Sequence, residues 1–208
     1  MVLRLRRLQP QSMMTSSLVP GVASAAFILG GQKSGKTRRA EQLAREWLEA
    51  HSQHKAVYLA TGQAWDDEMV QRIARHQADR ALRVPGMTTA EAPLDLSATL
   101  KNLSTPETMV VVDCLTMWLT NWFMPVVQNN SAVATSLQWK HERAAFLKFL
   151  QTCPGPVVVV GNEIGFGVIP LGAEVRRFVD ALGVLNQDVA KVCTSVTLMV
   201  AGLPMVLK

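Results

Sequence analysis

The chain has few cysteines and no C-x-x-C pair, and it lacks a hydrophobic run long enough to cross a bilayer. Its three cysteines, Cys114, Cys153 and Cys193, are odd in number and widely spaced, which favours free thiols in a reducing compartment over disulfides or a zinc site. The longest strongly apolar run, residues 115–127, is shorter than the roughly 20 residues of a transmembrane helix. We therefore expect a cytoplasmic protein without a membrane span.

Charge is also scarce, and it is almost balanced outside the N-terminus. The formal net charge is +5, but three arginines and no acid lie in residues 1–24, which leaves +2 for the rest of the chain. A nearly neutral domain gives no support to a nucleic-acid-binding surface. Residues 1–24 lack the continuous apolar core of a signal peptide. We interpret them as a basic, loosely ordered N-terminal extension, followed by one catalytic domain of residues 25–208.

The sequence does contain a phosphate-binding motif, G-x-x-x-x-G-K-[ST]. An apolar run at 25–29 precedes it and a helical pattern follows, an arrangement that directs backbone N–H groups and a helix N-terminus at an anion. In such loops the lysine, here Lys36, reaches the β- and γ-phosphates, and the hydroxyl, here Thr37, binds Mg²⁺. We predict a nucleoside triphosphate site, and this context disfavours a chance glycine turn. The motif residues are Gly30, Gly31, Gln32, Lys33, Ser34, Gly35, Lys36 and Thr37.

Short apolar runs alternate with helical stretches along the domain. Several runs are β-branched without polar alternation, as in strands buried on both faces. The runs lie at 27–29, 56–60, 109–112, 157–160 and 196–200, the helical stretches near 37–50, 66–79, 114–123, 133–152 and 172–191, and loops near 84–95, 103–107 and 128–132. This order predicts an α/β fold with a mainly parallel sheet covered by helices. Ligands of such folds bind beyond the carboxyl ends of the strands.

Two carboxylates directly follow predicted central strands. Asp113 ends an apolar run in the form of a Walker B element, whose aspartate helps to position Mg²⁺. The alternative is that Asp113 caps the next helix. Glu163 lies in a glycine-rich turn that allows close approach to a ligand, and we interpret it as a candidate catalytic or metal-shell group; an ordinary loop is the alternative. Polar residues of the next helix, taken one at a time, are interpreted as solvated: Arg176, Asp180, Asn186 and Gln187.

The helical segment near 66–79 carries a histidine whose role its spacing leaves open. Asp66 or Asp67 is predicted to cap this helix. His76 shares a face with the apolar residues Met69 and Ile73, and such a histidine is more often a packed structural residue than a catalytic one. In the helix from 114 to 123, Trp118 and Trp122 share a stripe that predicts core packing, with a subunit interface as the alternative.

Taken together, the motifs resemble those of the adenosylcobinamide kinase/adenosylcobinamide-phosphate guanylyltransferase family. The resemblance extends over about residues 25–203. It is carried by the phosphate loop, Tyr58-Leu59-Ala60-Thr61, Asp66-Asp67-Glu68-Met69, Arg72-Ile73-x-x-His76, Val112-Asp113-Cys114-Leu115-Thr116, Trp118-Leu119-x-Asn121, Asn162-Glu163-Ile164-Gly165-x-Gly167-x-x-Pro170 and Asn186-Gln187. The set is specific, whereas the phosphate loop alone is not.

The resemblance implies a RecA-like P-loop domain, a homotrimer and two reactions of cobalamin biosynthesis. The first is phosphorylation of adenosylcobinamide by ATP or GTP with Mg²⁺. The second is transfer of GMP from GTP to adenosylcobinamide-phosphate, through a guanylylated histidine, which gives adenosylcobinamide-GDP and pyrophosphate. His76 matches that histidine.

The resemblance also implies the roles of the other site residues. Lys36 and Glu163 join His76 as catalytic residues, and Thr37 and Asp113 bind the metal. Nucleotide-binding residues are those of the phosphate loop together with Thr61, Arg72, Glu91 and Asp113. By its spacing, Arg72 is placed to favour a neutral imidazole and to bind phosphate.

The chain departs from the family pattern at four positions. Lys33, Val179 and Val184 stand where arginine is common, and Met87 stands where the family has tryptophan. Lys33 keeps the charge but loses the bidentate fork of arginine, and the two valines remove charges. We expect these changes to affect substrate fine-tuning more than reaction class. The alternatives are a monofunctional kinase or guanylyltransferase, and a P-loop ATPase or regulatory nucleotide-binding module, which would need no reactive histidine.

Overall fold

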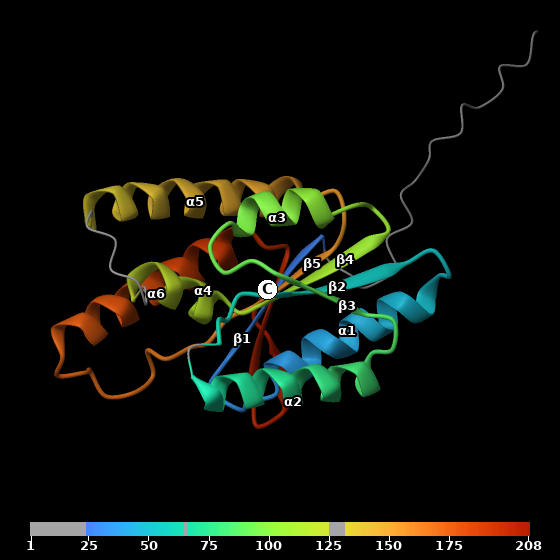
Figure 1. Ribbon diagram of the computed structural model, residues 1–208, viewed down its shortest axis with the longest axis horizontal. Coiled ribbons are helices and arrows are strands. Elements are labelled where there is room, and N and C mark those ends of the chain that lie inside the picture. The colour runs from blue at the N-terminus through green and yellow to red at the C-terminus, as the bar shows by residue number, and fades with distance from the viewer. Residues whose placement is uncertain (1–23, 65, 125–131) are drawn as a thin grey trace, which may run out of the picture.

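A computed structural model describes residues 24–64, 66–124 and 132–208 of the chain; the predicted extension, apart from Ser24, lies outside them. Seven strands and six helices form layers of helix, sheet and helix (Figure 1). In chain order these are β1 (Ala25–Gly30), α1 (Lys36–Ala50), β2 (Lys55–Ala60), α2 (Asp67–Arg83), β3 (Thr88–Glu91), α3 (Leu96–Leu103), β4 (Thr108–Asp113), α4 (Leu115–Phe123), α5 (Ala132–Thr152), β5 (Val157–Val160), α6 (Ala173–Val192), β6 (Ser195–Val200) and β7 (Leu203–Val206).

The strands form one sheet in the order β3-β2-β4-β5-β1-β6-β7. All neighbouring pairs are parallel except β6 and β7, which are antiparallel. The predicted α/β fold with a mainly parallel sheet is therefore confirmed. The phosphate-loop strand β1 and the strand of Asp113, β4, both flank β5, so their carboxyl ends lie close together at one edge.

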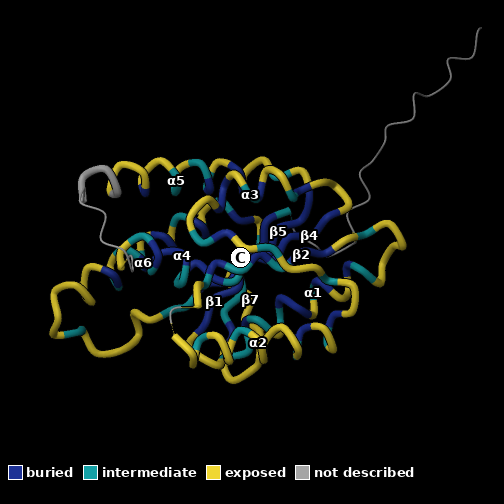
Figure 2. Tube along the Cα trace, in the orientation of Figure 1, coloured by how far each residue is buried: buried dark blue, intermediate teal, exposed yellow. Residues whose placement is uncertain are grey.

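The central strands are buried on both faces, which explains their unbroken apolar runs. One core cluster joins α3, α4, α5 and α6 to the sheet and contains Trp118 and Phe146. The second joins α1 to the opposite face and contains Trp47. Figure 2 shows the sheet as the dark, buried centre between the two helical layers. Trp118 is fully buried, so the core-packing prediction for this tryptophan is confirmed.

Three elements are absent from the sequence prediction, and each is short. β3 falls inside the segment predicted as a loop at 84–95; its four residues are largely exposed and pair only with β2 at the edge of the sheet. β7 is fully exposed at the opposite edge. α3 is eight residues long, about two turns. Elements of four to eight residues are too short to show a clear hydrophobic period, so the sequence pattern alone does not predict them.

The three cysteines are free thiols, as predicted. Burial raises the pKa of both Cys114 and Cys193 to about 12. Within the described residues, His, Cys, Asp and Glu side chains form no group of three or more that could hold a metal ion. No helix in that part of the chain is long and apolar enough to cross a membrane.

Candidate active site

The phosphate loop connects β1 to the N-terminus of α1. Gly30 packs against β6, where an added Cβ would lie 2.6 Å from the carbonyl oxygen of Met199, so a larger residue would displace the loop. Gly35 has a φ of 99°, in the region that favours glycine. The Nζ of Lys36 donates to the Gly31 carbonyl oxygen at 2.6 Å, so the lysine folds back over the loop. Burial lowers the pKa of Lys36, although the negative charge of Asp113 acts in the opposite direction.

Two oxygen groups meet where β4 reaches the phosphate loop. The Thr37 hydroxyl donates to Asp113 Oδ2 at 2.7 Å. Asp113 does not cap the next helix, because Cys114 occupies the N-cap position of α4 and no side chain caps it. A hydroxyl and a carboxylate side by side are ligands that Mg²⁺ prefers. The pair therefore fits the predicted metal site.

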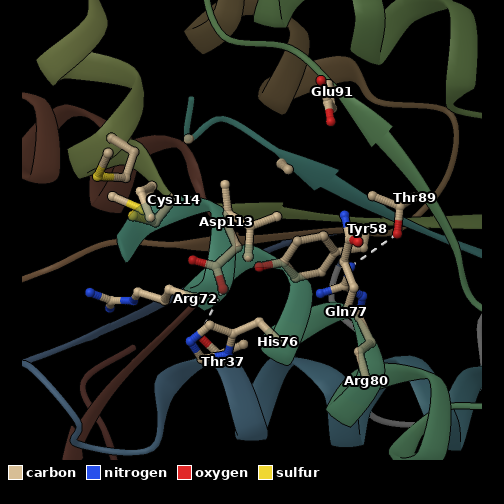
Figure 3. A pocket seen from close by; sticks show the side chains of 15 residues that line it. Thr37, Tyr58, Arg72, His76, Gln77, Arg80, Thr89, Glu91, Asp113 and Cys114 are labelled. Atoms are coloured by element: carbon tan, nitrogen blue, oxygen red, sulfur yellow. Dashed lines mark hydrogen bonds between the residues drawn. The ribbon is translucent and has the colours of Figure 1, made fainter. Parts of the chain in front are cut away.

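A cavity of about 220 Å³ lies between the carboxyl ends of the strands and α2. Figure 3 shows side chains converging on it from α1, α2, β2, β3 and β4. Five of the predicted site residues line this cavity: Thr37, Arg72, His76, Glu91 and Asp113. Residues distant in the sequence thus line one cavity at the carboxyl ends of the strands, where a ligand was predicted to bind.

His76 is presented to this cavity by a helix with a defined start. The Asp66 carboxylate accepts the Met69 backbone N–H at 2.7 Å, which confirms Asp66 as the N-cap. Met69 and Ile73 also line the cavity, so the apolar face predicted for the helix points into the site. His76 is exposed, and it is not a packed core histidine.

Of the phosphate loop only Thr37 lines the cavity, and two further predicted site residues, Glu163 and Thr61, also lie outside its lining. The Glu163 carboxylate accepts the Gly165 N–H at 3.0 Å, while the Glu163 backbone N–H donates to Gly30, which ties this turn to the phosphate loop. Thr61 is fully buried, and its hydroxyl exchanges two hydrogen bonds with the backbone of Cys114, at 2.7 and 2.8 Å. Thr61 thereby ties the end of β2 to the end of β4. The roles predicted for these two residues stay predictions.

Sequence reasoning missed a buried arginine in the site. Arg80 is 4% exposed, its guanidinium lies 3.6 Å from the centre of the Tyr58 ring, and it donates to the Thr89 hydroxyl at 3.0 Å. All three residues line the cavity. Arg80 follows His76 by one helical turn, and that spacing is the signal that could have placed it on the same face.

The polar residues of α6 were interpreted as solvated, and for Asn186 this is wrong. Asn186 is buried, and its side-chain amide donates to the Asn162 carbonyl oxygen at 3.0 Å. The contact holds the turn after β5 against α6. Asn121 acts in the same way on the opposite side of the site, since its amide donates to the carbonyl oxygens of Thr61 and Pro93. These motif residues position loops.

The four departures from the family pattern lie outside the cavity lining. Lys33 is exposed on the phosphate loop with a φ of 56°. Val179 and Val184 lie on α6, with Val184 partly exposed, and Met87 packs against the core on the α1 side of the sheet.

A family model and three known proteins that match this chain agree with one another. The family model described as cobinamide kinase / cobinamide phosphate guanyltransferase matches residues 26–207. A protein of Pseudomonas aeruginosa named bifunctional adenosylcobalamin biosynthesis protein CobP is 45% identical over 182 residues, which cover 88% of this chain and 96% of that protein. The bifunctional adenosylcobalamin biosynthesis protein CobU of Salmonella typhimurium is 31% identical over 191 residues, and that of Escherichia coli is 30% identical over 189; each alignment covers 88% of this chain and 98% of the relative.

Proposed function

Because the chain belongs to the cobinamide kinase / cobinamide phosphate guanyltransferase family, we propose that it phosphorylates adenosylcobinamide and then guanylylates the product through His76. It is an enzyme of cobalamin biosynthesis, a kinase and a guanylyltransferase. The observation that carries the proposed mechanism is the cavity, which His76 shares with Thr37 of the phosphate loop and with Asp113. A regulatory module would need no reactive histidine, so a demonstrated adduct on His76 would separate the two interpretations.

The kinase step uses the phosphate loop and the end of β4. Lys36 and the loop N–H groups bind the triphosphate of ATP or GTP, and Thr37 and Asp113 would hold Mg²⁺. When bound, Mg²⁺ neutralises phosphate charge. The aminopropanol hydroxyl of adenosylcobinamide attacks the γ-phosphorus, the bond to the β,γ-bridging oxygen breaks, and the nucleoside diphosphate leaves. Glu163, whose turn is bonded to Gly30, orients the hydroxyl and takes its proton.

The transferase step begins at His76. A neutral ring nitrogen attacks the α-phosphorus of GTP, a nitrogen–phosphorus bond forms, and pyrophosphate leaves. Arg72, one turn earlier on α2 and also lining the cavity, binds the phosphate oxygens on which charge develops. We assign Glu91, which reaches the same cavity from the end of β3, to nucleotide binding.

The second half of the transfer restores the histidine. A phosphate oxygen of adenosylcobinamide-phosphate attacks the phosphorus on His76, and the nitrogen–phosphorus bond breaks. The products are adenosylcobinamide-GDP and the free imidazole. A covalent carrier divides one difficult substitution into two easier ones, which is the advantage of nucleophilic catalysis.

The test is covalent labelling. Incubation with Mg²⁺ and GTP labelled at the α-phosphate should give an acid-labile, base-stable adduct that adenosylcobinamide-phosphate discharges. His76→Ala should abolish the adduct and leave phosphorylation of adenosylcobinamide in place. Labelling that persists in His76→Ala would remove the histidine from this role, and an unaltered protein that phosphorylates but never labels would be monofunctional.

We further propose that the enzyme works as a homotrimer in the cytoplasm. The segment 164–171, which follows β5, is rich in exposed apolar side chains, among them Phe166, Val168 and Leu171. Several large apolar side chains exposed in one short segment are typical of a protein contact site. Three free thiols are consistent with a reducing compartment.

A further inference from the structure

The helix that carries His76 has little apolar packing to hold it. Of the 17 residues of α2, only Arg80 is buried, and Figure 2 shows the helix mostly in the colour of exposed residues. Val70 and Leu82 are apolar but point into solvent. Burial of apolar surface therefore contributes little to the position of α2, and polar contacts must define it.

Those contacts gather at the C-terminal end of α2. Within the described residues, the hydrogen bonds and ion pairs from α2 to other elements come from Arg80 and Arg83 alone. Arg83 Nε donates to Glu41 Oε2 at 2.6 Å, and a second guanidinium nitrogen donates to Oε1 at 3.1 Å. The next residue, Val84, is buried in the core on the α1 side of the sheet.

The burial of the Glu41 carboxylate makes its pairing with Arg83 necessary. Glu41 lies on α1, one turn after Thr37, and its side chain is only 3% exposed. A buried carboxylate is costly unless it is paired and hydrogen-bonded, and here the fork of Arg83 engages both oxygens. Glu41 in turn raises the pKa of Arg83, chiefly through this hydrogen bond. A bidentate pair fixes orientation as well as distance.

We propose that the Glu41–Arg83 pair positions α2 for guanylyl transfer and is not required for phosphorylation. Glu41 belongs to the helix that begins at the phosphate loop, and Arg83 lies two turns after His76 on the helix that presents the imidazole. The pair thus sets the distance between the bound phosphates and the attacking nitrogen. The groups assigned to phosphorylation do not lie on α2; they are Lys36, Thr37, Asp113 and Glu163. The inference rests on the function proposed above.

The experiment compares the two half-reactions in the same variants. Arg83→Gln and Arg83→Lys should reduce the rate of adduct formation from α-labelled GTP about tenfold or more, since a misplacement of about 1 Å can cost about a hundredfold. Phosphorylation of adenosylcobinamide by γ-labelled ATP should stay within about twofold, an expectation from the same argument. Arg83→Lys keeps the charge but loses the fork, so its adduct formation should be intermediate.

Arg83→Gln leaves a buried carboxylate unpaired and can fail to fold for that reason alone. The double variant Glu41→Gln/Arg83→Gln removes the stranded charge, and it should show the same selective loss of adduct formation. The matched control is Glu49→Gln, which removes an exposed ion pair with Arg45 on the same helix α1 and should change neither rate.

In the double variant, loss of both rates in equal measure, or loss of neither, overturns the positioning role. If Arg83→Gln forms the adduct at the unaltered rate, the positioning role is wrong, and the assignment of His76 as the guanylylated residue is unaffected. Absence of the adduct in the unaltered protein overturns the His76 assignment itself, and with it this inference.

Discussion

Lys36 is the residue on which both proposed reactions depend, because each requires the triphosphate to be held in the phosphate loop. Its ammonium lies over the loop, bonded to Gly31. Lys36→Ala should lower the rates of phosphorylation and of adduct formation by about a hundredfold or more, the usual cost of removing one preorganised donor. Parallel assays with γ-labelled ATP and α-labelled GTP measure the two rates. Lys101→Ala, an exposed lysine of α3, is the control.

Full GMP transfer by Lys36→Ala would mean that GTP binds for the second reaction in a separate phosphate site. That result would leave the kinase assignment in place but would remove the single shared loop from the mechanism.

The cysteines give a second test at this scale. Burial raises the pKa of Cys114 and Cys193 to about 12. A raised pKa means less thiolate at a given pH, and at pH 8 the thiolate fraction should be about a thousandfold smaller than for a thiol of ordinary pKa. Alkylation by iodoacetamide at pH 8, followed by mass spectrometry, should therefore be slow at both residues in the folded protein and fast in urea. Rapid alkylation of the folded protein would contradict their burial.

At the scale of elements, the start of α2 can be tested separately from its end. Asp66→Ala removes the N-cap and should destabilise the first turn by about 1 kcal/mol. Because α2 is little packed, this loss should show as faster amide hydrogen exchange in residues 69–72 with a small change in the global free energy of unfolding. Asp67→Ala, in the same first turn but outside the cap, should have a weaker effect. If the two variants accelerate hydrogen exchange equally, the side chain of Asp66 does not stabilise the helix as an N-cap.

The elements that could be predicted are those with a clear signal in their own residues. β1, β4 and β5 are buried on both faces and give unbroken apolar runs, and the phosphate loop is a contiguous motif. β3 and β7 are strands of four residues at the sheet edges; β3 has no apolar run, and the run of β7 is interrupted by Pro204. Their existence depends on pairing with β2 and β6 rather than on their own composition.

The site residues also divide into those with a local sequence signal and those without one. Asp113 was predictable because a carboxylate at the end of an apolar strand is a local signal. His76 required the family resemblance, since its spacing alone favoured packing. Glu41 and Arg83 are 42 positions apart and became partners only when α1 and α2 were folded against each other. A single sequence gives no signal that a surface arginine and a helical glutamate so far apart will form a contact.

At the scale of the whole molecule, the sheet brings the ends of β1, β2, β4 and β5 to one edge, and the long segment 164–171 leaves from this edge. Several of its side chains are almost wholly exposed, Val168 at 97% and Leu171 at 98%. A monomer would leave this apolar surface in water. If the segment forms the contact between copies, each active site lies next to a neighbouring subunit.

From the family resemblance we expect a trimer in sedimentation equilibrium. If the segment 164–171 forms its contact, Phe166→Asp with Val168→Asp should shift the trimer towards the monomer, because a charge buried in an apolar contact is costly. Leu82→Asp is the matched control: Leu82 and Phe166 are both 82% exposed, but Leu82 lies on α2, away from this segment. A trimer that survives the two aspartates places the contact elsewhere on the molecule. A control that dissociates equally would show that added charge, rather than loss of this particular contact, separates the copies.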